Sequence, residues 1–226
     1  DYCKPSIRLS ALMGLKVIYV FSHDSIGLGE DGPTHQPIEQ LSGLRAIPNL
    51  NVFRPADMNE TLECWEVALK SNNTPSAIVL SRQKLSYINQ ENSEENKSEK
   101  GAYTVKITSH GSDVVLVASG SEVELALKVQ AKLKENNIDS KVVSMPCMEL
   151  FDKQSENYKK DIFNENAIVF TFEAGSVSSW QKYKGNRGYC FGIDKFGESA
   201  PYKKIFEYFN LTEDKILNII QKHLRK

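Results

Sequence analysis

Residues 23–37 are dense in side chains that bind hydroxyl groups and transfer protons. The segment, HDSIGLGEDGPTHQP, holds the imidazoles of His23 and His35 and three carboxyl groups, of which Asp31 precedes a glycine. Imidazole donates or accepts a hydrogen bond and titrates near neutral pH, whereas a carboxylate accepts hydrogen bonds from hydroxyl groups. This combination favours a site that holds a hydroxylated substrate and exchanges a proton with it.

A guanidinium group is expected at the same place. Arg82 follows the apolar run 76–81, and residues 23–37 follow the apolar run 16–22. The carboxyl ends of parallel strands meet at one edge of a sheet, and open α/β sheets bind ligands at that edge. Because arginine forms bidentate hydrogen bonds with phosphate oxygens, the combined residues predict a site for a phosphorylated polyol.

A metal site is the alternative, since histidine and aspartate are both metal ligands. His23, Asp31 and His35 are spread along a loop rather than over one turn of a helix, so their spacing defines no coordination geometry. We therefore favour a sugar phosphate and assign no metal ligand. The neighbouring Asp24 and Glu30 are interpreted as structural or supporting residues.

Apolar runs alternate with helical patterns along the chain, which is typical of an α/β protein. Near-continuous apolar runs suit strands that are covered on both faces of a parallel sheet. We expect strands at residues 16–22, 51–54, 76–81, 113–119, 140–145, 167–173 and 188–193. We expect helices at residues 37–46, 58–70, 122–136, 176–184, 201–209 and 212–223.

Two of these helices carry start signals. Asp57 or Asn59 is expected to cap the helix 58–70. Ser119 or Ser121, each with a glutamate three residues later, offers a capping box for the helix that starts near residue 122.

A polar segment divides the chain. Residues 89–100, NQENSEENKSEK, contain no apolar side chain, so we expect a solvated linker. Residues 1–88 then form a first unit with unpaired sheet edges, which we expect to be disordered or to associate unless further strands join it. Residues 101–226 form a second α/β unit that is long enough to fold independently.

Composition excludes several classes of function. The 226 residues carry a formal net charge of −1 without a long basic run, which argues against nucleic acid as a partner. No eighteen consecutive residues are apolar, so a membrane partner is not expected either. The four cysteines are widely spaced and predict reduced thiols in an intracellular protein.

One family accounts for the chemistry-bearing segment. Gly29–Arg45, GEDGPTHQPIEQLSGLR, resembles the pyrimidine-domain motif of transketolases. The resemblance continues in order through SRQ (Ser81–Gln83), GSEVELA (Gly120–Ala126), VSMP (Val143–Pro146), FDKQ (Phe151–Gln154) and FGESAP (Phe196–Pro201). Related thiamine enzymes carry other residues around the histidine of GPTHQP, whereas a dihydroxyacetone synthase stays open as an alternative. A non-catalytic α/β interaction module is the alternative from another class.

The resemblance implies an activity and assigns residues to it. Transketolases move a two-carbon glycolaldehyde unit from a ketose phosphate to an aldose phosphate in the pentose phosphate pathway. By position, His23 and Arg82 match the sugar-phosphate contacts, and Asp31 matches the carboxylate that reads a hydroxyl beside the reacting carbon. His35 matches the catalytic histidine near the ketose carbonyl, and it also contacts substrate. Tyr2 matches an aromatic residue of the pocket around the aminopyrimidine ring of the cofactor.

The resemblance also implies what this chain lacks. The chain corresponds to the second half of the thiamine-pyrimidine domain, with its mostly parallel sheet, and to a complete C-terminal domain that sits away from the chemistry. Thiamine diphosphate and its divalent metal, Mg²⁺ or Ca²⁺, are held mainly by the part absent here. We therefore expect a piece of a cytoplasmic homodimeric enzyme that is inactive alone.

Overall fold

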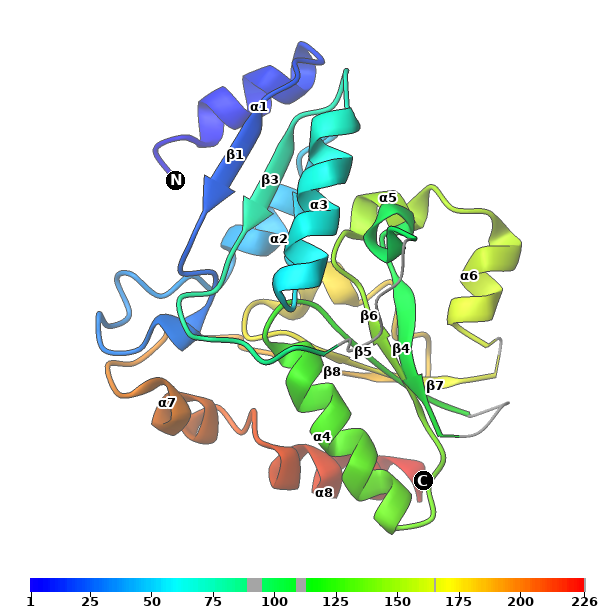
Figure 1. The fold of residues 1–226 in the computed structure, drawn as a ribbon. Helices are drawn as coiled ribbons and strands as arrows, with labels where there is room; N and C mark the ends of the chain where they lie inside the picture. The colour runs from blue at the N-terminus through cyan, green and yellow to red at the C-terminus, as the bar shows by residue number, and fades with distance from the viewer. Residues whose placement is uncertain (89–94, 109–112, 165, 226) are drawn as a thin grey trace.

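The computed structural model describes residues 1–88, 95–108, 113–164 and 166–225 (Figure 1). A parallel sheet with the order β1-β3-β2 occupies the first part of the chain, which confirms the expected strands there. Its elements, in chain order, are α1 (Lys4–Leu12), β1 (Ile18–Phe21), the 3₁₀ helix η1 (Ile26–Leu28), α2 (Gln40–Arg45), β2 (Asn51–Phe53), α3 (Met58–Lys70) and β3 (Ser76–Val79).

Helices cover both faces of this sheet. Ala77 and Val79 of β3 pack with α1 and α2, whereas Ile78 points to the other face and packs with α3. This alternation follows from the two-residue repeat of a strand. Both faces are therefore apolar, as the continuous run of β3 indicates.

The second sheet has the order β4-β6-β5-β7-β8, and all of its pairs are parallel except β4 with β6. Its strands are β4 (Tyr103–Ile107), β5 (Val114–Ala118), β6 (Lys141–Ser144), β7 (Ile168–Phe172) and β8 (Tyr189–Phe191). Its helices are α4 (Glu122–Glu135), α5 (Met148–Asp152), α6 (Glu156–Ile162), α7 (Tyr202–Tyr208) and α8 (Glu213–Leu224), and η2 (Lys97–Lys100) and η3 (Val177–Trp180) are 3₁₀ helices.

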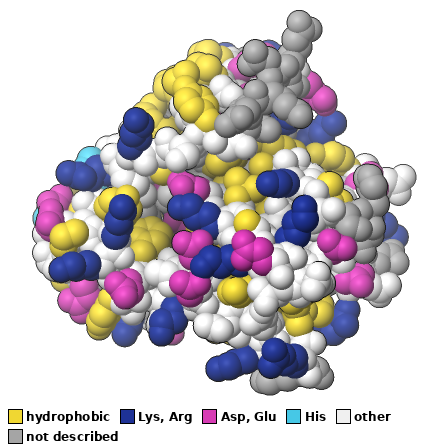
Figure 2. Space-filling view, turned by 60° about the horizontal axis from the view of Figure 1, so that its bottom comes forward, with side chains coloured by type: hydrophobic (Ala, Val, Ile, Leu, Met, Phe, Trp, Pro, Cys, Tyr) yellow, Lys and Arg dark blue, Asp and Glu magenta, His cyan; other side chains and the backbone are white. Residues whose placement is uncertain are grey.

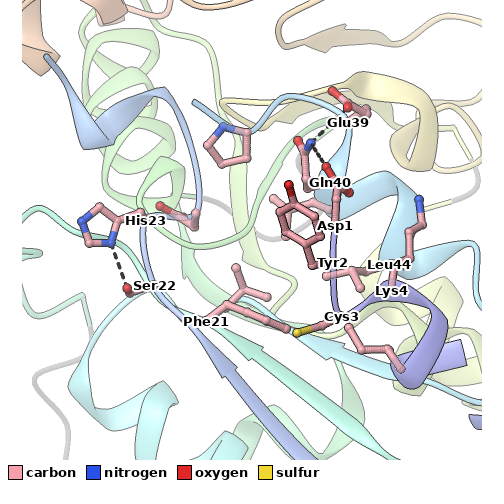
Figure 3. Close-up of a pocket in the computed structure, with 15 residues that line it drawn as sticks. Asp1, Tyr2, Cys3, Lys4, Phe21, Ser22, His23, Glu39, Gln40 and Leu44 are labelled. Atoms are coloured by element: carbon pink, nitrogen blue, oxygen red, sulfur yellow. Dashed lines mark hydrogen bonds between the residues drawn. The ribbon is translucent and has the colours of Figure 1, made fainter. Parts of the chain in front are cut away.

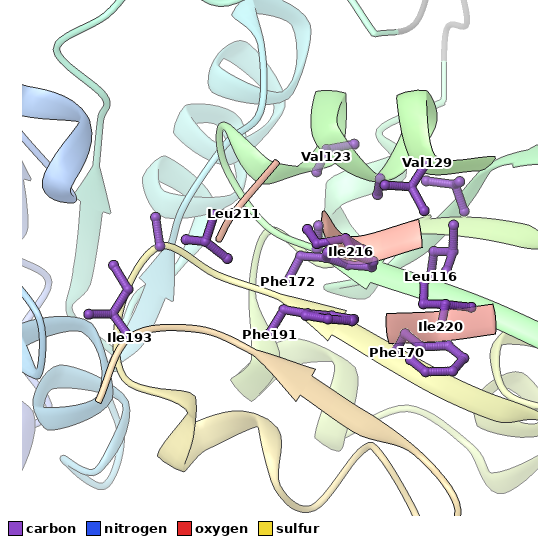
Figure 4. Packing of buried hydrophobic residues seen from close by; sticks show 14 of the residues in the cluster. Leu116, Val123, Val129, Phe170, Phe172, Phe191, Ile193, Leu211, Ile216 and Ile220 are labelled. Atoms are coloured by element: carbon purple, nitrogen blue, oxygen red, sulfur yellow. The ribbon is translucent and has the colours of Figure 1, made fainter. Parts of the chain in front are cut away.

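The core of the second sheet lies on its two faces. On one face Leu116, Phe170 and Phe172 pack against α4 and α8, as Figure 4 shows. On the other face Val115 and Val117 pack with Phe151 and Trp180. The first of these clusters also contains Ile26, Ile38 and Ala56, so the two sheets share buried apolar contacts.

Three sequence-based expectations about elements are wrong. Residues 103–107 form a strand that was not predicted, because an antiparallel edge strand exposes alternate residues and lacks a continuous apolar run. The helix expected at 176–184 is only the short η3. Neither Ser119 nor Ser121 forms a capping box: the Ser121 hydroxyl donates to Glu122, and that of Ser119 donates to Glu173.

One residue of the expected linker is docked on the first unit. Ser98 is fully buried because its backbone N–H and its hydroxyl both donate to the Glu63 carboxylate of α3, at 2.9 and 2.6 Å. Ser98 is thus docked on α3, whereas Glu95, Glu99 and Lys100 are exposed. Residues 89–94 lie outside the described part of the chain, so the solvated linker stays a prediction. Whether residues 1–88 and 101–226 are separate folding units stays a prediction.

Charges of both signs alternate on the surface. Figure 2 shows positive and negative side chains interspersed over one face of the molecule. Examples are Lys128 with Glu124, and Lys132 with Asp214, which pair at 2.9 and 2.5 Å. Among the described residues, no helix is both long and apolar enough to span a membrane.

Candidate active site at the rim of the first sheet

The loop after β1 begins with a left-handed residue. His23 has φ of 65° and is exposed, and its Nδ1 lies 2.8 Å from the Ser22 hydroxyl. A non-glycine residue in this region is uncommon and is often found at functional sites. The backbone then turns inward, so that the next side chain, Asp24, is buried.

Asp24 anchors the loop through a buried ion pair. Arg54, at the end of β2, donates from Nε and Nη2 to Asp24 Oδ2 at 2.8 and 2.7 Å. Arg54 Nη1 also lies 2.5 Å from Glu122 Oε2 in the second unit. The structural role expected for Asp24 is thereby explained.

In this network the buried arginines and carboxylates stabilise one another's charged forms. Burial disfavours the charged guanidinium, but the carboxylates of Glu122, Asp24 and Glu173 outweigh burial and raise the pKa of Arg54. Burial likewise disfavours the Glu173 carboxylate, but Arg45, with two hydrogen bonds at 2.7 and 2.9 Å, lowers the pKa of Glu173. Both arginines are therefore fixed cations at the junction of the two sheets.

Glycine lets the loop after β3 approach the loop after β1. A Cβ on Gly27 would lie 2.6 Å from the side chain of Gln83, so the two loops touch at this point. Gln83 is the neighbour of Arg82, which is exposed. Parallel pairing of β1 with β3 and this contact bring the loop of Arg82 against the loop of His23 at one edge of the sheet.

The second part of the same loop is held by the other unit. Gln36 is buried, and its Nε2 donates to the carbonyls of Gly29 and Glu198, each at 2.7 Å. The Ser199 hydroxyl donates to the carbonyl of Glu30 at 2.6 Å. Figure 1 shows the segment before α7 beside the loop that follows β1. The expectation that the second unit sits away from these residues is wrong, because its segment 197–201 packs directly on residues 29–36.

Asp31 and His35, between these anchors, are exposed. His35 Nδ1 lies 2.9 Å from the Thr34 hydroxyl, and the His35 backbone N–H donates to the Gly32 carbonyl. None of the four side chains of His23, Asp31, His35 and Arg82 is hydrogen bonded or ion-paired to another of them. The four residues lie on two touching loops at one rim, and all four are exposed.

A cavity of about 350 Å³ opens beside this rim. Figure 3 shows Tyr2, Phe21 and Leu44 lining it, with His23 at its margin. Further apolar side chains in its wall are Ile7, Leu41 and Val79. Its size and apolar wall suit a flat heteroaromatic ring.

The described residues contain no group of three or more His, Cys, Asp or Glu side chains that could hold a metal ion. Among the described residues, His223 is the one histidine outside the rim. It is half-buried and packs edge-on against Phe170 with ring centroids 5.6 Å apart. His110 lies outside the described residues.

Two family descriptions match the chain in succession. Residues 1–87 match the pyrimidine binding domain of transketolase, and residues 101–212 match the transketolase-like C-terminal domain. The transketolase of Bacillus subtilis is 48% identical over 229 residues, a match that covers 100% of this chain and 34% of the relative. The chain belongs to the transketolase family.

Solved transketolase structures agree with this assignment. The transketolase of Pichia stipitis in complex with sedoheptulose 7-phosphate is 40% identical with a TM-score of 0.92, over 99% of this chain and 32% of that one. The transketolase of Campylobacter jejuni is 43% identical with a TM-score of 0.90, over 98% of this chain and 34% of that one. This transketolase chain thus spans about a third of the length of its relatives.

Sequence reasoning missed two contacts that build the site. In the sequence, Gln83 and the segment 196–201 are informative only as parts of the resemblance, which assigns no contact to either of them. Gln36 and Glu198 are 162 positions apart, and such a pair leaves no local periodic signal. The signal that was present is glycine: Gly27, Gly32 and Gly197 mark the places where another segment comes close.

Proposed function

We propose that this chain supplies the sugar-binding rim of a transketolase that moves a glycolaldehyde unit from a ketose phosphate to an aldose phosphate. The observation that carries the proposal is the likeness, over 99% of the chain, to a transketolase described in complex with sedoheptulose 7-phosphate. The rim geometry is consistent with it, since two imidazoles, a carboxylate and a guanidinium lie on adjoining loops at the carboxyl edge of a parallel sheet.

In this proposal Arg82 and His23 bind the phosphate of the sugar, because both donate hydrogen bonds to phosphate oxygens. Asp31 accepts a hydrogen bond from a hydroxyl next to the reacting carbon and so selects its configuration. His35 is the catalytic residue, and its imidazole holds or returns the proton at the oxygen of the ketose carbonyl. All four side chains are accessible to a ligand at the rim.

The cavity beside Tyr2 fits the ring end of thiamine diphosphate. Its wall is apolar and aromatic, and Tyr2 and Phe21 offer ring faces against which a pyrimidine can stack. Bound thiamine supplies the nucleophilic carbon that the reaction needs. The diphosphate and a divalent metal, Mg²⁺ or Ca²⁺, are assigned to the remaining two thirds of the enzyme.

The finer features of the whole enzyme belong to the same proposal. We place it in the cytoplasm as a homodimer that acts in the pentose phosphate pathway. Sugar phosphates are its ligands, and nucleic acid and membranes are not.

Replacement of Asp31 by Ala in the full-length protein tests this function. We expect the variant to lose discrimination between ketose donors that differ in configuration beside the carbonyl, by roughly tenfold to hundredfold in kcat/KM ratio, because one charged hydrogen bond to a hydroxyl is removed. The measurement is glycolaldehyde transfer from matched ketose phosphates to a common aldose phosphate.

Glu30→Ala is the matched control, since it removes the neighbouring exposed carboxylate of the same loop. It should leave the ratio of kcat/KM values unchanged. A full-length wild type without ketol transfer refutes the proposed activity. Equal kinetics for wild type and Asp31→Ala refute the role of Asp31, whereas a wild type without transfer favours an interaction module.

A further inference from the structure

The amide of Gln36 uses its hydrogen-bonding groups to join two parts of the molecule. Its Nε2 donates to Gly29 O and to Glu198 O, at 2.7 Å each, and its Oε1 accepts from the Glu198 N–H at 2.9 Å. Only 4% of the residue is exposed. One side chain therefore ties the start of the loop 29–36 to its end, and both to the second unit.

The second unit is shaped to receive this amide. A Cβ on Gly197 would lie 1.8 Å from Gln36 Oε1, so only glycine allows this approach. Ser199 adds a second bond, to the carbonyl of Glu30, and its Cβ lies 3.7 Å from the position of a Cβ on Gly32. Segment 197–201 thus contacts residues 29–36 at several separate points.

The loop has few other restraints where the chemistry is proposed. The Asp31 and His35 side chains are exposed, and the backbone between the anchors is held by hydrogen bonds from His35 N and Gln36 N to the Gly32 carbonyl. Gly29 and Gly32 have φ of 93° and 83°, and glycine, which has no Cβ, gives a backbone access to more conformations than other residues do. The position of both side chains therefore depends on anchors outside the segment.

We propose that Gln36 is a positioning residue that, together with segment 197–201 of the C-terminal domain, sets the places of Asp31 and His35 relative to the sugar. The inference rests on the proposed function and adds a role in donor selection to the C-terminal domain. Gln36 itself touches no substrate; it acts through the backbone of residues 29–36. A displacement of about 1 Å at such a site costs roughly a hundredfold in rate, so a lost anchor has a measurable effect.

The matched control is another buried glutamine in the same chain. Gln130 is 1% exposed, and its Nε2 donates to the carbonyls of Lys106 and Ser140 at 3.3 and 2.9 Å, entirely within the C-terminal domain. Gln36→Ala and Gln130→Ala each remove a buried amide with two carbonyl partners. The two substitutions differ in one respect: the Gln36 amide is bonded to the loop 29–36, and the Gln130 amide is not.

The kinetic test uses the full-length protein. We expect Gln36→Ala to lower kcat/KM for a ketose phosphate roughly tenfold to hundredfold, whereas Gln130→Ala changes it less than about threefold. Both variants should bind thiamine diphosphate as tightly as wild type, measured by quenching of intrinsic fluorescence, because the cavity at Tyr2 is untouched. Equal kinetic losses in the two variants would overturn the proposal.

Amide hydrogen exchange on the full-length protein gives a readout without activity. In Gln36→Ala the amides of His35 and Gly29 should exchange at least about tenfold faster, with no change in Gln130→Ala. Ser199→Ala, which removes one bond and keeps the buried amide, should show a smaller change in the same direction, so the test survives poor folding of Gln36→Ala. Unchanged exchange of residues 29–36 in both Gln36→Ala and Ser199→Ala overturns the positioning role, whatever the outcome for ketol transfer.

Discussion

At the scale of single residues, burial changes the pKa of the Glu60 carboxyl group. The residue is 1% exposed, and its carboxylate accepts hydrogen bonds from Tyr103 and Ser144, at 2.8 and 2.5 Å, and from Ala56 N at 2.7 Å. Burial raises the pKa of Glu60 to about 7, although these three donors favour the carboxylate. Because Tyr103 and Ser144 lie in the second unit, this titration takes place at the junction.

The raised pKa predicts a fall in stability with rising pH. Between the ordinary value of 4.5 and about 7, folded Glu60 keeps a proton that the unfolded chain releases. The folded state then binds more protons, so the free energy of unfolding falls by about 1.4 kcal/mol per pH unit, and the stabilisation is complete only below 4.5. Glu60→Gln should remove this slope in urea unfolding at pH 5, 6 and 7.

Glu66→Gln, on an exposed position of the same helix, is the control and should keep the slope. A Glu60→Gln variant with the wild-type slope would show that Glu60 ionises normally in the folded chain.

At the scale of elements, helix α3 is defined by its cap and by the groups attached to it. Asp57 Oδ1 accepts the Glu60 N–H at 2.9 Å, so Asp57 is the cap of the two candidates, Asp57 and Asn59, that the sequence offers. Asp57 Oδ2 accepts the Ile88 N–H at 3.0 Å. The second bond holds the chain after the rim loop that carries Arg82. One carboxylate thus caps the start of α3 and also holds the backbone at Ile88, where the first unit ends.

Asp57→Ala should lower the free energy of unfolding by about 1–2 kcal/mol, because a helix cap is lost and the Ile88 N–H loses its partner. Thr212→Ala is the comparison, since Thr212 stands at the N-cap of α8 without a side-chain cap bond; its effect should stay within about 0.5 kcal/mol. Urea unfolding of the two variants measures the difference, and similar losses would contradict the role of the cap.

At the scale of the whole molecule, Arg54 connects the two sheets. Its guanidinium is fully buried and lies 2.7 Å from Asp24, 2.5 Å from Glu122 and 3.6 Å from Glu173. A Cβ at position 120 would lie 2.8 Å from this guanidinium, so no residue larger than Gly120 fits there. The loop of His23 is therefore anchored to the C-terminal domain through Asp24 and Arg54.

Arg54→Met should lower the free energy of unfolding by about 3–5 kcal/mol, since it leaves buried carboxylates without their cation. Arg8→Met, at an exposed position of α1, should change it by less than about 0.5 kcal/mol. Thermal and urea unfolding of the chain give the values. A loss for Arg54→Met as small as that for Arg8→Met would show that the network contributes little to the fold.

Local sequence determined the elements and the chemistry that they carry. Runs such as 76–81 predicted strands because burial on both faces demands apolar residues throughout, and Asp57 predicted a helix start because its carboxylate reaches the first free N–H groups. The motif around His35 predicted the family for a similar reason, since its residues are adjacent in the chain.

Tertiary structure alone decided how these parts are held together. Arg54 and Asp24 are 30 residues apart, and Gln36 and Glu198 are 162 apart. The antiparallel strand β4 and the docking of Ser98 on α3 likewise depend on partners distant in the chain. The periodicity of apolar residues predicts which face of a helix or strand is buried. It does not predict which residue from a distant part of the chain that face contacts, because such contacts depend on how whole elements pack.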